Sequence, residues 1–288
     1  MIDLHMHSCM SDGTDPIPEL LRKVREAGIT VFSVTDHDTM EGALEMERLV
    51  KEQCPADVTF IRGIEFSSIT EEGKCHILGY GCDRNEKAFT DILEEGAAKR
   101  RNKLEKRLSF LKEEFGIEFE ADEISHLRSM NSVGKPHLGN MLVEKGYAEI
   151  RDEAIEKYIE PCKTETDRLD GGKVIRTILR AGGVPVWAHP LGGTGESELS
   201  IPEFEKQLKT LKDFGLMGLE CYYSRYTIEQ ADMLASVAVK NGLRVSGGSD
   251  YHGKNKPVHL GKLNASGVPV TEDRLSVLEV IKPYQHHK

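Results

Sequence analysis

Short apolar, β-branched runs alternate with amphipathic stretches at both ends of the 288-residue chain. Helical periodicity, as in residues 18–27 and 40–52, separates the first runs and would supply the crossovers that parallel strands need. This order predicts an α/β protein with a closed or nearly closed parallel β/α barrel. The seven predicted strands are residues 2–7, 31–35, 59–65, 76–80, 184–188, 218–222 and 244–248.

One connection does not fit an all-parallel barrel. Only residues 70–74 lie in the turn region between the third and fourth predicted strands, whereas a parallel crossover needs about a dozen residues. We therefore expect these two strands to pair antiparallel.

The middle of the chain, residues 84–176, shows no convincing strand pattern, and its apolar residues have helical spacing. They include Leu93, Ala97, Leu104, Leu108, Leu111 and Phe115. We predict a helical insert (cap) domain here, with the barrel formed by residues 1–83 and 177–288. A basic stretch at residues 99–107 has two interpretations. A solvated helix face is the expected one, and a phosphate-attracting rim is the alternative.

The chain is acidic overall, with 38 Lys and Arg against 48 Asp and Glu and a formal charge of −10. This charge argues against a protein that coats duplex nucleic acid or an anionic membrane. No apolar run is long enough to span a bilayer, and the first residues do not resemble a secretory signal. We expect a cytoplasmic location.

Potential metal ligands gather where the predicted strands end. Alternation along the first strand sends Asp3, His5 and His7 to one face, and the last strand does the same with Asp250 and His252. Small residues below Asp250 would leave room for ions. Further polar residues at strand ends are Asp36, His37, Asp38, Glu65, His76 and His189. Barrel active sites lie at the carboxyl-terminal rim, so this pattern indicates a metal site there.

These residues occur in motifs that resemble those of PHP (polymerase and histidinol phosphatase) domains. The resemblance covers nearly the whole chain, and the similar subgroup is that of small stand-alone phosphoesterases acting on nucleotides. The motifs are His5-Met6-His7-Ser8, Ser11-Asp12-Gly13, Thr35-Asp36-His37-Asp38, Gly63-Ile64-Glu65, His76-Ile77-Leu78-Gly79, Gly134-Lys135-Pro136-His137, Ala188-His189-Pro190 and Gly248-Ser249-Asp250-Tyr251-His252.

The resemblance implies a distorted seven-stranded, TIM-like barrel of the PHP fold that holds three divalent ions. Carried over by motif, the first ion would be held by His5, His7, Glu65 and Asp250. The second would be held by Glu65, His76 and His137, and the third by Asp12, His37 and His252. Nitrogen and oxygen ligands without thiolate suit Mn²⁺, Fe²⁺ or Zn²⁺ and do not choose among them. Asp36 and Asp38 would orient ligands or cap the following helix.

The expected activity is metal-dependent hydrolysis of phosphate esters of nucleotides. Substrates would be nucleoside monophosphates, 3′,5′-bisphosphonucleotides or short 5′-phosphorylated oligonucleotides, with the insert restricting access. We expect Asp250 to take up the proton of the attacking water, and His189 to bind phosphate or protonate the leaving oxygen. Further candidate substrate contacts are Lys135, Arg101 and Arg225, and Tyr222 or Tyr223 would stack on a base or pack in the rim.

Two alternatives remain open at this point. A histidinol-phosphate phosphatase would use a similar barrel and similar ligands, but we would expect it to have a smaller insert. A non-catalytic domain that binds metal and nucleotide would be expected to lack one or more ligands, whereas every motif position here carries a competent residue.

Overall fold

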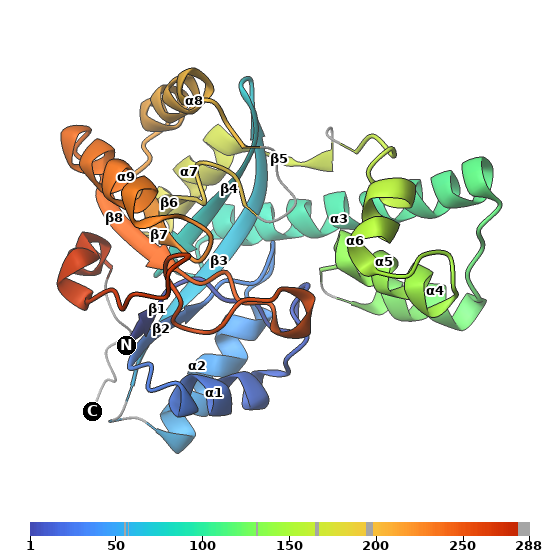
Figure 1. Cartoon of the computed structure of the whole chain (residues 1–288), viewed down its shortest axis with the longest axis horizontal. Coiled ribbons are helices and arrows are strands. Elements are labelled where there is room, and N and C mark those ends of the chain that lie inside the picture. The colour runs from blue at the N-terminus through green and yellow to red at the C-terminus, as the bar shows by residue number, and fades with distance from the viewer. Residues whose placement is uncertain (55, 57, 131, 165–166, 194–197, 282–288) are drawn as a thin grey trace.

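Seven strands of one mixed sheet form a nearly closed barrel in the computed structural model, which describes residues 1–281 except 55, 57, 131, 165–166 and 194–197 (Figure 1). In spatial order they are β1 (Ile2–Asp3), β2 (Val31–Val34), β3 (Thr59–Thr70), β4 (Gly73–Tyr80), β6 (Val184–Ala188), β7 (Gly218–Tyr223) and β8 (Arg244–Gly248). Backbone hydrogen bonds from Leu4 N to Gly247 O and from His7 N to Tyr251 O join the first and last strands. The predicted seven-stranded barrel is confirmed.

The β3–β4 pair is antiparallel, as the short connection predicts. Their hairpin is longer than expected, because pairing continues to Thr70 and Gly73 at the turn. Strand β4 also pairs antiparallel with β6, whereas the other neighbours around the barrel are parallel. The reversal of β4 brings the start of that strand to the rim at which its neighbours end, so His76 lies on the same rim as Glu65.

The first strand is shorter than the predicted residues 2–7. Regular pairing with β2 ends at Asp3, whose carboxylate accepts a hydrogen bond from the backbone N–H of His5. The following residues pair with β8 and the segment after it, including a bridge between Met6 and Tyr251, while Met6 O still accepts a hydrogen bond from Thr35 N. His5 and His7 therefore lie where the first and last strands of the barrel meet.

Five helices cover the outside of the barrel (Figure 1). They are α1 (Ile17–Glu26), α2 (Glu41–Gln53), α7 (Gly171–Arg180), α8 (Ile201–Asp213) and α9 (Ile228–Lys240). Each buries an apolar stripe; in α1 this stripe contains Leu20, Leu21 and Val24. Short 3₁₀ turns follow β8 at Gly253–Asn255, Glu272–Arg274 and Ser276–Glu279.

The cap consists of helices that project from one side of the barrel (Figure 1). They are α3 (Lys87–Phe115), α4 (Ala121–Ser129), α5 (Lys135–Glu144), α6 (Arg151–Ala154) and a π-helical turn at Ile155–Ile159. The cap has its own apolar core, which includes Leu104, Leu127 and Leu142. Phe89, near the start of α3, belongs to the barrel core instead, so α3 spans both parts.

The insert also contains a strand that the sequence pattern did not reveal. Residues Leu169–Asp170 form β5, which pairs in parallel with the extension of β3. Two residues are too few to show strand periodicity, and this pairing depends on the length of β3. Among the described residues, no helix combines the length and apolar character required to cross a membrane.

Candidate metal centre

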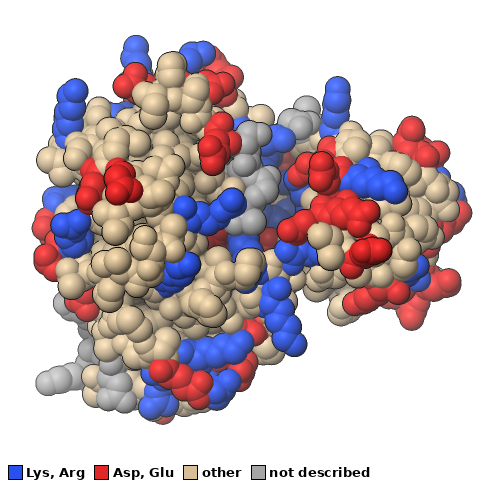
Figure 2. Space-filling model, viewed as in Figure 1, with Lys and Arg blue, Asp and Glu red and all other residues tan. Residues whose placement is uncertain are grey.

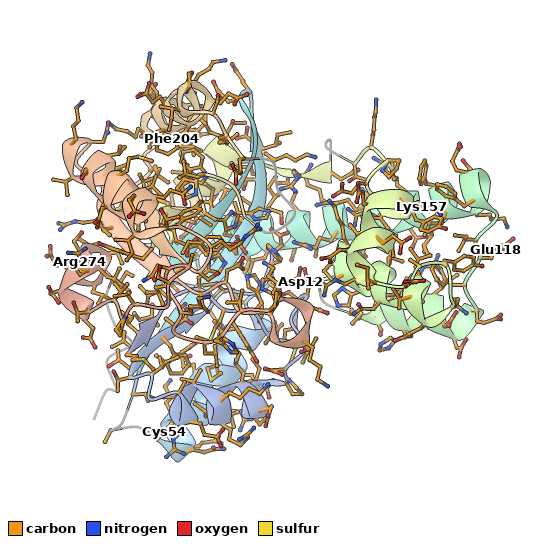
Figure 3. All side chains as sticks on the ribbon, in the orientation of Figure 1. Asp12, Cys54, Glu118, Lys157, Phe204 and Arg274 are labelled. Carbon is orange, nitrogen blue, oxygen red and sulfur yellow. The ribbon has the colours of Figure 1, made fainter. Side chains whose placement is uncertain are left out.

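Histidine and carboxylate side chains converge at the rim of the barrel, on the side that faces the cap. Asp12 marks this position between the barrel and the cap (Figure 3). Within the described residues, three groups have ligand atoms close enough to share an ion. They are His5, His7, Glu65 and Asp250; His37, Glu65 and His76; and His7, Asp12, His37 and His252.

The first group agrees with the expected ligand set. The Nε2 atoms of His5 and His7 lie 3.1 Å apart. They lie 3.2 and 3.1 Å, respectively, from Glu65 Oε2, and 3.6 and 3.5 Å from Asp250 Oδ1. Atoms held about 2.0–2.2 Å from one ion are separated by roughly 3.0–3.6 Å. These four atoms therefore have the spacing of ligands around a single ion.

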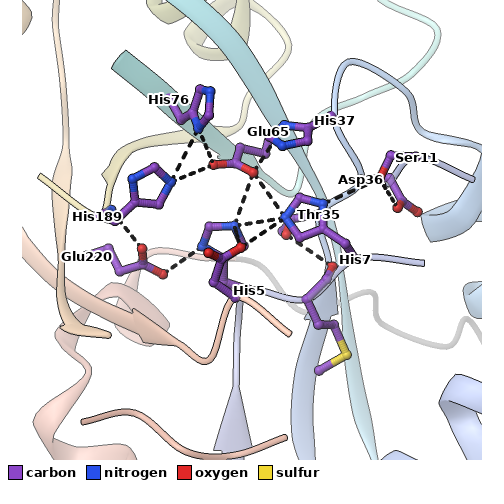
Figure 4. Close-up of polar contacts among 12 residues, drawn as sticks. His5, His7, Ser11, Thr35, Asp36, His37, Glu65, His76, His189 and Glu220 are labelled. Atoms are coloured by element: carbon purple, nitrogen blue, oxygen red, sulfur yellow. Dashed lines mark hydrogen bonds and ion pairs between the residues drawn. The ribbon is translucent and has the colours of Figure 1, made fainter. Parts of the chain in front are cut away.

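In the second group, His37 Nδ1 lies 3.2 Å from Glu65 Oε2, whereas His76 lies at the other oxygen, Oε1, where His189 joins it (Figure 4). Glu65 Oε1 lies 3.1 Å from His76 Nδ1 and 3.1 Å from His189 Nε2, and these two nitrogens are 3.3 Å apart. The structure thus brings His189, rather than the expected His137, to Glu65 and His76. His137 Nδ1 instead accepts a hydrogen bond from the backbone of Gly134, close to Asp12.

The third group contains the expected Asp12, His37 and His252, together with His7. Asp12 Oδ1 lies 3.2 Å from His252 Nε2, and Asp12 Oδ2 lies 3.9 Å from His37 Nε2. His252 Nδ1 donates to the backbone oxygen of Asp250, which leaves Nε2 available as a ligand. His7 directs Nε2 into the first group and Nδ1 towards Asp12, so it borders both groups.

Electrostatics keep two of the candidate ligands, Glu65 and His7, in the forms that a cation requires. Burial alone would raise the pKa of Glu65, but the charges of His37, His5 and His76 hold it well below its usual value. Burial and the neighbouring His252 lower the pKa of His7 to about 4. A charged carboxylate beside a neutral imidazole is the protonation state in which both bind metal.

Glu220 is a functional residue that the sequence analysis missed. It is fully buried on β7, accepts a hydrogen bond from His5 Nδ1 at 2.9 Å and another from the backbone N–H of His189 at 2.8 Å. It therefore holds Nε2 of His5 towards the first group and positions the loop of His189. A glutamate between apolar residues on a barrel strand, in Leu219-Glu220-Cys221, is the signal that could have revealed it.

Lys256 and Tyr223 hold the outer oxygen of Asp250. Lys256 Nζ lies 2.6 Å and the Tyr223 hydroxyl 2.9 Å from Asp250 Oδ2, while Oδ1 faces the histidines. Burial would raise the pKa of Asp250, but the charges of Lys256, His252 and His5 hold it well below its usual value. A carboxylate this acidic suits a ligand better than a base at neutral pH. Lys256 follows the last motif and carried no sequence signal.

Asp36 and Asp38 orient the site and do not cap the next helix. Asp36 accepts hydrogen bonds from the backbone and hydroxyl of Ser8 and from the hydroxyl of Ser11, which fixes the loop that carries Asp12. Asp38 accepts from the backbone N–H of Ser67, next to Glu65 on the same strand. Neither side chain donates or accepts at the start of α2, whose N-cap is Met40.

Small and strained residues give the site its shape. A Cβ atom on Gly248 would lie 2.2 Å from Cβ of His5, so the glycine makes room for the histidine rather than for an ion. Three non-glycine residues among those described have positive φ angles, Asp38 at 54°, His189 at 31° and Asp250 at 58°. All three lie at this rim, and such strain is typical of functional sites.

The expected substrate contacts are exposed or bonded to residues other than the candidate ligands. Lys135, at the start of α5, pairs with Glu160 at 2.8 Å, and Arg101 is exposed on α3. Arg225 is exposed and donates to the backbone oxygen of Gly193. Tyr222 and Tyr223 are buried, which agrees with the alternative of packing within the rim.

The basic stretch at residues 99–107 is not a uniformly solvated face. Arg100, Lys103 and Arg107 are only 7–8% exposed, because the face of α3 that carries them turns inward. The solvated interpretation is wrong for these three residues, although it holds for Arg101 and Lys106. Helical spacing shows which residues share a face, but it does not show which face meets the barrel.

Known proteins are similar to this chain in sequence and in fold. The chain is 30% identical to the phosphoribosyl 1,2-cyclic phosphate 1,2-diphosphodiesterase of Eggerthella lenta, over 90% of this chain and 97% of that protein. It is also 30% identical to a 5′-3′ exoribonuclease of Haemophilus influenzae, over 94% and 97% of the two chains. A solved structure of a candidate metal-dependent phosphoesterase from Bifidobacterium adolescentis superposes with a TM-score of 0.80 at 27% identity, covering 97% of this chain and 94% of that one.

The family model that matches the chain is described as the PHP domain, and the match covers residues 3–161. This segment contains the ligand candidates of the first six motifs, from His5 to His137, together with most of the cap. The chain therefore belongs to the PHP domain family of metal-dependent phosphoesterases.

Proposed function

We propose that this protein hydrolyses phosphate esters of nucleotides, with three divalent ions bound at the rim. The observation that carries the proposal is the position of Glu65. Each of its two oxygens belongs to a separate set of histidine nitrogens, at 3.1–3.2 Å. A carboxylate shared in this way suits two neighbouring cations, and the Asp12 group suits a third.

We assign His189 to the second ion in place of His137. Its Nε2 forms an almost equilateral triangle with Glu65 Oε1 and His76 Nδ1, whereas the hydrogen bond described for His137 Nδ1 is with the backbone N–H of Gly134. Divalent ions in such a site supply a water-derived nucleophile at neutral pH and neutralise charge on phosphoryl oxygens. The ligand types fit manganese, iron or zinc.

The chain's own residues would orient the reacting groups. Lys256 and Tyr223 hold Asp250 in place through its outer oxygen, and Glu220 holds His5. Because Lys256 keeps Asp250 acidic, we favour a ligand role for Asp250 over uptake of the proton from water. Lys135, Arg101 and Arg225 remain our candidates for contacts to the outer part of the substrate.

The substrate class follows from both relatives and geometry. The two relatives are named for a cyclic phosphate of phosphoribose and for RNA, which share a phosphate ester on ribose. The cap beside the rim leaves the metal centre between two bodies, and Lys and Arg side chains lie near the seam between them together with Asp and Glu side chains (Figure 2). We therefore favour a mononucleotide, a bisphosphonucleotide or the phosphorylated end of a short oligonucleotide.

The deciding experiment is phosphate release by the protein after reconstitution with Mn²⁺, Fe²⁺ or Zn²⁺. The panel contains a nucleoside monophosphate, a 3′,5′-bisphosphonucleotide, a 5′-phosphorylated dinucleotide and histidinol phosphate. We expect turnover of at least one nucleotide substrate and little of histidinol phosphate. A preference for histidinol phosphate would replace our proposal, and nucleotide binding without turnover of any compound would favour a non-catalytic domain.

Metal content tests the ligand assignment independently of activity. We expect His189→Asn to bind one ion fewer than the wild type, by elemental analysis after reconstitution and desalting. His137→Asn should retain all ions, as should the control His126→Asn at an exposed position of α4. Loss of an ion from His137→Asn but not from His189→Asn would restore the assignment implied by the sequence motifs.

A further inference from the structure

Three cations on the inner face of α3 form what we call the basic row: Arg100, Lys103 and Arg107. Their spacing places them on one side of the helix, and each is only 7–8% exposed. Lysine and arginine are rarely buried to this extent unless anions pair with them. The basic row therefore requires an explanation that ordinary surface charge does not provide.

The basic row begins at the metal centre. Arg100 Nε donates to Asp38 Oδ2 at 2.7 Å, and its Nη2 donates to the hydroxyl of Ser67 at 2.8 Å. Asp38 follows the ligand candidate His37 in the chain. From Arg100 the row follows α3 towards the cap, with Lys103 and Arg107 roughly 4.5 and 10 Å further along the helix axis.

Among the residues that the structure describes, which leave out 165 and 166, the anions near the row are too few to neutralise it. Among the described residues, Lys103 has no hydrogen bond or ion pair. The buried Nε of Arg107 has no hydrogen-bond partner. The described carboxylates that attract these cations are Asp38, near Lys103, and Asp167, near Arg107. Both already have partners, because Asp38 pairs with Arg100 and Asp167 pairs at 2.5 Å with Lys106 on another face of α3.

A further unsatisfied group lies beside the row. The hydroxyl of Ser132 is buried without a hydrogen-bond partner, and the next residue, Val133, accepts a hydrogen bond from Arg100 through its backbone oxygen. Burial and the charges of Arg100 and Arg168 lower the pKa of Lys103 to about 6. Buried donors with an excess of positive charge are the features of a site that binds an anion.

We propose that the basic row binds a second phosphate group of the substrate, while the scissile phosphate lies at the metal centre. This inference rests on the proposed phosphoesterase function and specifies its substrate. Arginine and lysine recognise phosphate by charge-assisted hydrogen bonds, and the row lies at one side of the ligand groups. The second phosphate would be a terminal monoester of a bisphosphonucleotide or the next phosphodiester of a short single strand, which share the same anionic oxygens.

The test compares substrates with and without the second phosphate. Metal-reconstituted wild type, Lys103→Met and Arg107→Gln are assayed on a nucleoside monophosphate, a 3′,5′-bisphosphonucleotide and a 5′-phosphorylated dinucleotide. Each variant should lower the ratio of kcat/KM on a two-phosphate substrate to that on the monophosphate by about tenfold or more. The control is Lys112→Met, at a 62% exposed side chain of the same helix, which should keep the wild-type ratio.

The two sources of phosphate give different results. A lower ratio only on the bisphosphonucleotide identifies a monoester, and a lower ratio only on the dinucleotide identifies a phosphodiester. If wild type hydrolyses the substrates but neither variant changes either ratio, the basic row is not a phosphate site, although the phosphoesterase function stands.

Binding is measured separately, so that the two proposals can fail independently. Inorganic phosphate is added to the full-length, chelator-treated protein, and its Tm is followed. We expect phosphate to raise the Tm of wild type and Lys112→Met more than that of Lys103→Met. Equal Tm shifts in all three proteins would overturn the basic row. If wild type hydrolyses no substrate, the proposed function fails, and this binding result still decides the role of the row.

Discussion

The charge state of Lys103 in the folded protein provides a quantitative test of the burial and positive charge described for the inner face of α3. Burial and the nearby charges of Arg100 and Arg168 lower its pKa from 10.5 to about 6 in the folded protein. Between pH 6 and 10.5 the folded chain therefore keeps this side chain mostly neutral, whereas the unfolded chain protonates it. Because the unfolded state binds one more proton, the stability of the wild type rises with pH across this window.

Replacement by methionine removes the titration and nearly conserves the volume. One proton corresponds to about 1.4 kcal/mol per pH unit. The free energy of unfolding of Lys103→Met should therefore exceed that of wild type by up to about 5 kcal/mol at pH 7, falling to about 2 kcal/mol at pH 9. Below pH 6 the difference should become constant, because both states are then protonated.

The assay is urea unfolding of chelator-treated protein at half-unit pH intervals from 5.5 to 9, in a buffer without phosphate or sulfate. Lys112→Met, at an exposed position of the same helix, is the matched control, and its difference from wild type should not vary with pH. A constant difference for Lys103→Met between pH 7 and 9 would refute the reasoning, since Lys103 would then be charged in the folded state. Added phosphate should reduce the pH dependence if an anion restores the charged form.

Three further predictions concern the metal centre. Glu220→Gln leaves one acceptor oxygen for the two N–H groups of His5 and His189. Metal affinity, measured by chelator competition, should therefore fall about 10- to 100-fold. Unchanged affinity would exclude a positioning role for Glu220. Gly42→Ala places a Cβ atom 2.0 Å from Asp36 Oδ2, so it should displace that carboxylate and destabilise the chain by about 1–3 kcal/mol in urea unfolding, and a neutral effect would contradict the described contact. Mn²⁺ at 100 times its dissociation constant should stabilise wild type by about 2.7 kcal/mol, and the Tm of His7→Asn should rise less; an equal rise would place the ion elsewhere.

Local pattern was sufficient for the barrel and for gathering the candidate ligands of the first ion group at one rim. Strand alternation alone brings His5 and His7 to one face, and the short turn before β4 explains why His76 meets Glu65. The motifs imply His137 as a ligand of the second ion, whereas the geometry leads us to propose His189. Pattern alone does not decide between them, since the choice depends on how the cap sits on the barrel. It also could not reveal Lys256, whose contact with Asp250 depends on the course of an irregular segment.

Local charge at the rim differs from the net charge of the chain. The formal net charge of −10 argues against long-range attraction of polyanions. The carboxylates of Asp12, Glu65 and Asp250, however, face inward towards the proposed cations. Three dications would exceed the charge of these three carboxylates, and Arg100, Lys103 and Arg107 add further positive charge beside them. A small substrate with two phosphates matches this excess, whereas one phosphate would leave the basic row unpaired. The affinity gained from a second phosphate should therefore persist at salt concentrations that screen exposed charges, because the row is buried. An advantage that disappears at 0.5 M KCl would assign it to exposed residues such as Arg101 instead.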